Sequence, residues 1–137
     1  DFTKPYRGIV ETLETLYDAG VKFAVASNKY QEGTEMLLKK LFGKYRFVSI
    51  LGQRAGKPIK PDPMIVHEAM NAMEGIRPEE VVYCGDSDVD MQTGINAGVR
   101  TIGVTWGFRT REELASYSPW MLAENAEDIS NAILAEK

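Results

Sequence analysis

The stretch "CGDSDVD" at residues 84–90 places three carboxylates, Asp86, Asp88 and Asp90, at alternating positions. Three negative charges at this spacing repel one another in a compact chain, so a positive charge is expected beside them. Carboxylate oxygens suit Mg²⁺, which proteins often hold with one or two carboxylates and the phosphate of a substrate. The stretch therefore points to a site for Mg²⁺ and phosphate.

Two other interpretations compete for these aspartates. An EF-hand calcium loop is excluded, because its sixth position needs glycine and holds Met91, and its twelfth needs glutamate and holds Ala97. In a purely structural interpretation, Asp88 caps the helix that follows while Asp86 and Asp90 lie in solvent. The local pattern alone leaves this second interpretation open beside the metal site.

A second polar cluster follows the apolar run "VKFAVAS". Ser27 and Asn28 offer a hydroxyl and backbone N–H groups at the expected end of a strand, which together could form a small anion-binding nest. Serine and asparagine are also common turn residues, so the pattern is equally typical of a turn. We treat both residues as candidate phosphate ligands.

The third cluster, "GKPIKPDP", contains Lys60 shortly before an expected helix start at Asp62 and Pro63. Prolines on both sides stiffen the segment and restrict where the lysine can point. An ammonium facing carboxylates and phosphate would balance the charge of the site. A solvated surface lysine is the usual alternative, and Lys57 competes for the same role.

Alternating periodicities place these clusters on an α/β fold, in which helices cover both faces of a parallel sheet in three Rossmann-like layers. Ligands of such sheets bind beyond the carboxyl ends of the strands, where the three polar clusters fall. We expect helices over residues 7–18, 31–41, 62–73, 88–97 and 127–135, and strands that end near Ser27, over 47–51, over 81–84 and over 101–105.

The bulk composition limits the classes of function. A length of 137 residues predicts one domain, spanning 1–137, and 44% hydrophobic and 26% charged residues are ordinary for a globular protein. A net charge of −4 argues against nucleic acid as partner, and no apolar run is long enough for a membrane span. The single cysteine, Cys84, excludes an internal disulfide and fits a reducing cytoplasm.

In this order, "GIVETLETLYDAGVKFAVASNK", "KPIKPDP" and "VVYCGDSDVDMQTGINAGVRTIGVTWGF" resemble the haloacid dehalogenase-like hydrolases, and among them the phosphoglycolate phosphatase type. The resemblance implies a Mg²⁺-dependent phosphatase that acts on a small phosphorylated metabolite through an aspartyl-phosphate. It matches Ser27 to the phosphate-binding residue, with the Asn28 N–H beside it, and Lys60 to the lysine that steadies phosphoryl group and nucleophile. Asp86 matches the Mg²⁺ ligand, and Asp90 the acidic partner that supports the metal or its waters.

The sequence departs from the family at its first motif, an Asp-x-Asp-Gly-Thr type segment that supplies the nucleophile, because no Asp-x-Asp-Gly occurs in the 137 residues. The chain thus resembles the C-terminal part of the core domain, without its first strand and cap domain, and we expect it to be inactive alone. Three alternatives remain: a non-catalytic phosphate- or metal-binding module, a signalling receiver domain, which the late position of the aspartates disfavours, or a sugar-phosphate mutase of the same superfamily.

The resemblance also implies that the missing strand lies between "FAVAS" and "VVYC", in the middle of the sheet. Unpaired buried backbone groups cost about 1–3 kcal/mol each, which is large against a net stability of about 5–15 kcal/mol. An open gap is therefore the least favoured arrangement. We expect another segment or chain to fill it or, less favourably, the two strands to close up and pair.

Overall fold

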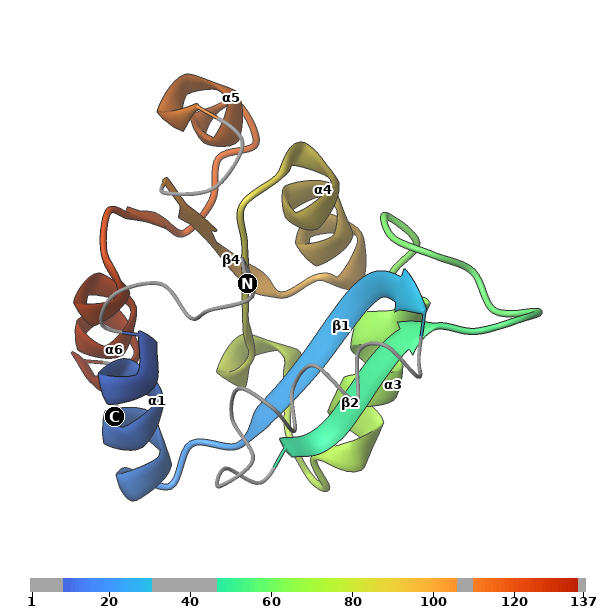
Figure 1. The fold of residues 1–137 in the computed structure, drawn as a ribbon, viewed down its shortest axis with the longest axis horizontal. Helices are drawn as coiled ribbons and strands as arrows, with labels where there is room; N and C mark the ends of the chain where they lie inside the picture. Colours follow the sequence, from blue (N-terminus) through green and yellow to red (C-terminus); the bar gives the residue numbers. More distant parts are fainter. Residues whose placement is uncertain (1–8, 31–46, 106–109, 136–137) are drawn as a thin grey trace, which may run out of the picture.

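The structure is a computed structural model that describes residues 9–30, 47–105 and 110–135; for residues 9, 10, 27–30, 47–50 and 53 only the backbone is described. Its elements in chain order are α1 (Ile9–Asp18), β1 (Phe23–Tyr30), β2 (Phe47–Gln53), α3 (Met64–Ala72), the 3-10 turn η1 (Pro78–Glu80), β3 (Val82–Gly85), α4 (Asp88–Ala97), β4 (Arg100–Val104), α5 (Arg111–Ala115), β5 (Met121–Ala123) and α6 (Ala126–Ala135) (Figure 1). The helix expected over 31–41 lies outside the described residues.

All ladders between the described strands are parallel, as the α/β prediction requires. In the first sheet, β1 pairs with β2, from Phe23 opposite Phe47 to Tyr30 opposite Gln53, with two register shifts. In the second sheet, β4 lies between β3 and β5. The fold class is confirmed.

The helices bury apolar side chains against both faces of the strands, so that three layers form. One buried cluster joins α3 to the end of α4 and to β1, β2 and β3; its members are Ile65, Val66, Ala97 and Val99. A second cluster joins β4 and β5 to α6 through Ile102, Val104, Ala123 and Ile129. Helix α1 packs beside α6, as Figure 1 shows. The segments that follow β2 and β3 come together at the contact between Lys60 and Asp90.

The sheet is divided between β1 and β3. Within the described ranges β1 pairs only with β2, and β3 only with β4, so one edge of each strand faces the division. The prediction that β1 and β3 could close up and pair directly is therefore wrong. Residues of α1, α3 and α6 line the space between the two strands, and filling of this space by another segment remains a proposal.

Most element boundaries lie within one or two residues of the predicted ones, and two of the differences have a clear physical reason. Strand β1 continues past Ser27 to Tyr30, because its backbone pairs again with β2 after a bulge even though the apolar run has ended. Helix α3 begins at Met64 with Pro63 as its cap residue, one position later than predicted. Asp62 still supports this start, since its Oδ1 accepts a hydrogen bond of 2.9 Å from the Met64 N–H.

Candidate functional site

The acidic segment begins α4 through a reciprocal pair of hydrogen bonds. Ser87 is the N-cap residue, and its Oγ accepts a hydrogen bond from the Asp90 N–H at 3.2 Å. The same hydroxyl donates to Asp90 Oδ2 at 3.1 Å. The negative charge of Asp90 also lies in the first helical turn, where the helix dipole favours it. Asp88 is therefore not the N-cap residue, contrary to the structural interpretation of the sequence.

Asp90 is buried, and both oxygens of its carboxylate have donors. Oδ1 accepts from the Lys60 ammonium at 2.6 Å and, at the longer distance of 3.4 Å, from the Tyr83 hydroxyl. Oδ2 accepts from Ser87 Oγ and from the backbone N–H of Asp86, at 3.1 Å each. The side chains of Lys60 and Asp90 are only 11% and 12% exposed. The positive charge expected beside the aspartates is thus Lys60.

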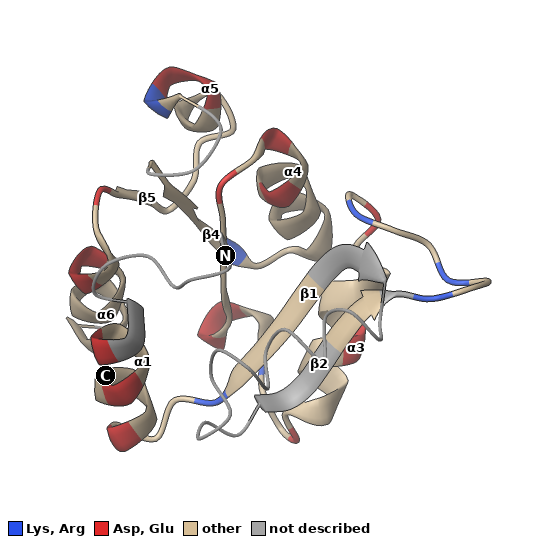
Figure 2. Cartoon of the chain, viewed as in Figure 1, with Lys and Arg blue, Asp and Glu red and all other residues tan. Residues whose placement is uncertain are grey.

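The loop that carries Lys60 is fastened to α4. The side-chain amide of Asn96 donates a hydrogen bond of 2.9 Å to the carbonyl of Pro61, directly after Lys60. Lys57 is exposed and forms no ion pair among the described residues, so the geometry favours Lys60 over Lys57. Figure 2 shows basic residues along the loop after β2 and acidic residues at the start of α4, the two segments that this pair connects.

Gly85 is required by the close approach of Asp90. A Cβ atom placed on Gly85 would collide with the Cβ and Cγ atoms of Asp90 and would lie 2.5 Å from its Oδ2. Real Cβ atoms do not approach other heavy atoms this closely, so any larger residue would displace the carboxylate.

Asp86 and Asp90 differ in their suitability for Mg²⁺. Within the described ranges the Asp86 carboxylate has no hydrogen-bond or ion-pair partner, so its oxygens are available to a hard cation. The Asp90 carboxylate already has four donors and would have to give some of them up. The described part of the chain contains no group of three or more His, Cys, Asp or Glu residues that could hold a metal. These residues fit part of a Mg²⁺ site, with Asp86 as the available ligand.

The structure places the backbone of Ser27 and Asn28 within β1, before its last residue, Tyr30. Their side chains lie outside what the structure describes, so it does not test whether they approach Lys60 and Asp86. Both remain candidate phosphate ligands, on a strand whose edge faces the divided sheet.

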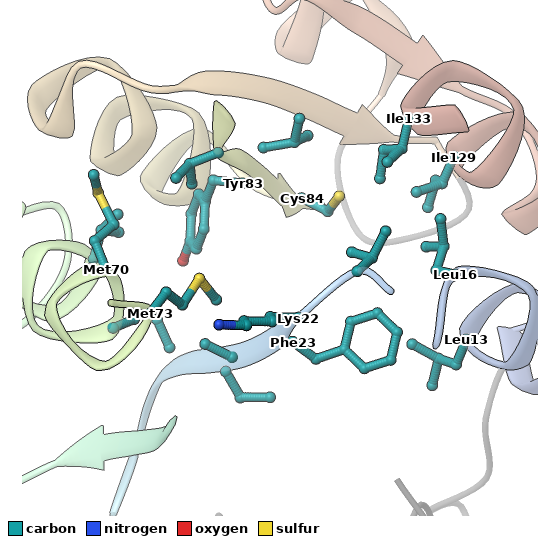
Figure 3. A pocket seen from close by; sticks show the side chains of 18 of the residues that line it. Leu13, Leu16, Lys22, Phe23, Met70, Met73, Tyr83, Cys84, Ile129 and Ile133 are labelled. Carbon is teal, nitrogen blue, oxygen red and sulfur yellow. The ribbon is translucent and has the colours of Figure 1, made fainter. Parts of the chain in front are cut away.

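A largely apolar cavity of about 410 Å³ occupies the division between β1 and β3 (Figure 3). Its walls come from these two strands and from α1, α3 and α6, and Lys22 is the only charged residue among the described residues that line it. Cys84 reaches water through this opening, but the apolar atoms around it raise the pKa of its thiol to about 12. Both open strand edges and the cavity thus lie at the same place.

Sequence reasoning missed three residues of the charged site. Ser87 could have been found, since Ser-x-x-Asp over 87–90 is a capping-box pattern. Asn96 gave no signal, because its contact to Pro61 joins residues 35 positions apart. Tyr83 was interpreted as one more apolar strand residue. Burial, and then the charge of Asp90, raise the pKa of Tyr83 well above its usual value, so its hydroxyl keeps its proton.

The fold and this site together define an α/β protein of Rossmann-like architecture with a charged site at the carboxyl ends of its strands. Residues 1–104 match the family model described as haloacid dehalogenase-like hydrolase, and the chain belongs to this family. None of the helices in the described ranges is long and apolar enough to cross a membrane.

Proteins similar to this chain are named for two different activities, pyrophosphatase and phosphoglycolate phosphatase. The chain is 32% identical to the pyrophosphatase PpaX of Halalkalibacterium halodurans, covering 95% of this chain and 60% of the relative. It is 34% identical to phosphoglycolate phosphatase 1 of Pseudomonas aeruginosa, covering 93% of this chain and 46% of the relative. A solved structure assigned as a phosphoglycolate phosphatase, from Lactobacillus delbrueckii subsp. bulgaricus, superposes with a TM-score of 0.88 at 35% identity, covering 95% and 54%. The chain thus spans about half to three fifths of these relatives.

Proposed function

We propose that this chain is the phosphate- and metal-binding part of a Mg²⁺-dependent phosphomonoester hydrolase that acts on a small phosphorylated metabolite. The single observation that carries the proposal is the ion pair of 2.6 Å between Lys60 and the buried Asp90, beside an Asp86 carboxylate with no described partner. Such an arrangement presents one cation and one hard anionic ligand at the same sheet edge. The names of the chain's relatives, pyrophosphatase and phosphoglycolate phosphatase, support the proposal.

In this proposal each residue has a distinct role. Lys60 would contact the phosphoryl group and offset its charge, and Asp90 holds Lys60 in place and joins it to the loop that carries Asp86. Asp86 would hold Mg²⁺, which when bound neutralises charge on the phosphoryl oxygens. Ser27 and the Asn28 N–H would bind the phosphate from β1. The nucleophilic aspartate that would form the aspartyl-phosphate is not among these residues.

The second part of the proposal is that an extended apolar segment from outside these 137 residues fills the cavity between β1 and β3. Each of the two strands presents an edge of backbone donors and acceptors there, which a small apolar molecule could not satisfy. The segments that follow β2 and β3 meet at the Lys60–Asp90 pair, and β1 is parallel to β2, so one inserted strand could run parallel to both neighbours. The same segment is the natural carrier of the nucleophile.

The test is a phosphatase assay with an aryl phosphate substrate, with Mg²⁺ and with a chelator in its place. The chain alone should show no robust turnover, whereas the protein in which a segment carrying an Asp-x-Asp motif fills the cavity should show Mg²⁺-dependent turnover. In that protein, Lys60→Ala should lower the rate on the order of 10²-fold or more, and Lys57→Ala should have little effect.

Two results would contradict the proposal. Robust activity of the chain alone that Asp86→Asn removes would show that no outside nucleophile is needed. Equal losses for the two lysine variants would remove Lys60 from its role. The absence of Asp-x-Asp-Gly from these residues favours the alternative of a non-catalytic binding module. This alternative predicts that the protein whose cavity is filled by the added segment binds phosphate and Mg²⁺ without turnover. A mutase would instead transfer phosphate between positions of a sugar.

A further inference from the structure

Tyr83 lies where the cavity between β1 and β3 meets the charged site. Its side chain lines the cavity in Figure 3, while its hydroxyl donates to Asp90 Oδ1 at 3.4 Å. The Lys60 ammonium lies 5.9 Å from the centre of its ring. Tyr83 therefore contacts both members of the ion pair from one side, and the cavity from the other.

The surroundings of the ring limit where the hydroxyl can go. The ring packs against the buried cluster that joins α3 and α4. A Cβ atom on Gly94 would be 3.6 Å from the ring atom Cδ2, so the backbone of α4 passes beside it. The hydroxyl remains protonated, as shown above, and can therefore only donate to the carboxylate. Tyr83 is only partly buried, and it also lines the cavity.

We propose that Tyr83 is a positioning residue that holds Asp90, and through it Lys60, in place, and that filling the cavity fixes this contact. The inference rests on the proposed function, since it concerns the same site. At 3.4 Å the hydroxyl contact is longer than a usual O–H···O bond of about 2.7–2.8 Å. A segment inserted beside β3 covers the open side of the ring and presses the hydroxyl toward Asp90. Tyr83 itself contacts no substrate atom and is not a catalytic residue.

The central test uses the Tyr83→Phe substitution, which removes the hydroxyl and keeps the ring. In the protein with its cavity filled, we expect kcat for an aryl phosphate to fall roughly three- to tenfold, because one of four donors to Asp90 is lost, a hydrogen bond being worth about 1 kcal/mol. KM should stay within about twofold. Tyr117→Phe is the matched control, since Tyr117 lies outside both cavity and site and should change neither constant.

A second measurement detects the contact without any turnover. In the chain labelled with ¹³C at the tyrosine Cζ position, Tyr83→Phe identifies the Tyr83 signal. Asp90→Asn removes the charge that the hydroxyl faces and should move this signal, whereas Asp88→Asn should leave it unchanged. Insertion of the segment that carries the Asp-x-Asp motif into the cavity should move the Tyr83 signal further in the parent chain.

The outcomes separate the two proposals. A Tyr83→Phe variant that melts at a lower temperature but keeps its kcat at assay temperatures would show a merely structural residue and overturn the inference. A Tyr83 signal that ignores Asp90→Asn would do the same. If the filled parent protein shows no turnover at all, the proposed function fails, and the labelled signal alone decides whether Tyr83 holds Asp90.

Discussion

Removal of the Lys60 ammonium is the most direct perturbation of the charged site. Lys60→Met keeps most of the aliphatic length of the side chain and leaves Asp90 buried without its closest donor. Removing one partner of a buried ion pair typically costs about 3–5 kcal/mol. Asp90 keeps three of its four donors, from Tyr83, Ser87 and the Asp86 N–H. We therefore expect a smaller loss, of about 2–4 kcal/mol in the free energy of unfolding.

The assay is urea denaturation at pH 7, followed by a thermal scan. For a domain of 137 residues, 1 kcal/mol corresponds to a change in Tm of about 3–5 °C, so Lys60→Met should lower Tm by roughly 10 °C. Lys57→Met is the matched control. Because Lys57 is exposed, its substitution should change the free energy of unfolding by less than about 0.5 kcal/mol.

A double-mutant cycle then isolates the pair. Asp90→Asn should itself destabilise the protein, but Lys60→Met in that background should cost much less than in the parent, with a coupling energy of about 1–3 kcal/mol. A coupling energy near zero would show that the 2.6 Å contact does not stabilise the fold. Equal losses for Lys60→Met and Lys57→Met would refute the choice of Lys60 altogether.

The remaining predictions concern three other groups. Mg²⁺ should raise the Tm of the parent and of Asp88→Asn, but not that of Asp86→Asn, because it binds only the folded state; an equal response of all three would exclude Asp86 as the ligand. The forked hydrogen bonds of 2.9 and 3.0 Å from Arg54 lower the pKa of Glu68, so their stabilisation is present above the unfolded pKa near 4.3 and is lost as pH falls through the lower folded value. Since both side chains are 28% exposed, Arg54→Met should lower the free energy of unfolding by only about 0.5–1 kcal/mol at pH 7. Measured by urea denaturation, the free energy of unfolding of this variant should also depend less on pH between about pH 5 and 3 than that of the parent. Because the apolar surroundings raise the pKa of the Cys84 thiol, Cys84 should react with a disulfide reagent at pH 8 more slowly than in the unfolded chain, and equal rates would contradict the apolar cavity.

Local sequence signals predicted the elements around the site well. The helix over 88–97 was predicted with the bounds that the structure has, since its first turn is acidic and Gly98 follows its last residue in a left-handed conformation with φ of 74°. The strand ends of β2 and β3 were predicted within a few residues, because short apolar runs stop there. Such boundaries depend on neighbouring residues, which a sequence shows directly.

Features that depend on distant contacts were not predictable in the same way. The continuation of β1 to Tyr30 depends on its partner β2, and the short strand β5 and helix α5 carry too few apolar residues to show a period. The Lys60–Asp90 contact joins residues 30 positions apart. Local patterns offered Lys60 beside Lys57 and three aspartates, and only the resemblance to a family gave Lys60 and Asp90 distinct roles. The role of the Tyr83 hydroxyl could not be inferred, because a tyrosine in an apolar strand gives the same pattern as any large apolar residue.

The cavity and the incomplete metal site have one explanation. A strand inserted between β1 and β3 and parallel to them would end beside Lys60 and Asp86, since the segments that follow β2 and β3 meet there. Carboxylates on that end would complete the Mg²⁺ ligands that the described residues supply only in part. Insertion and Mg²⁺ binding should therefore each strengthen the other by the same factor, as linkage requires. We expect a fluorescently labelled segment with an Asp-x-Asp end to bind at least tenfold more tightly with Mg²⁺ than with a chelator, and Asp86→Asn to abolish the difference. A segment with Asn-x-Asn in its place should bind equally in both. Equal affinity of the acidic segment with and without Mg²⁺ would mean that the strand and the metal occupy independent sites.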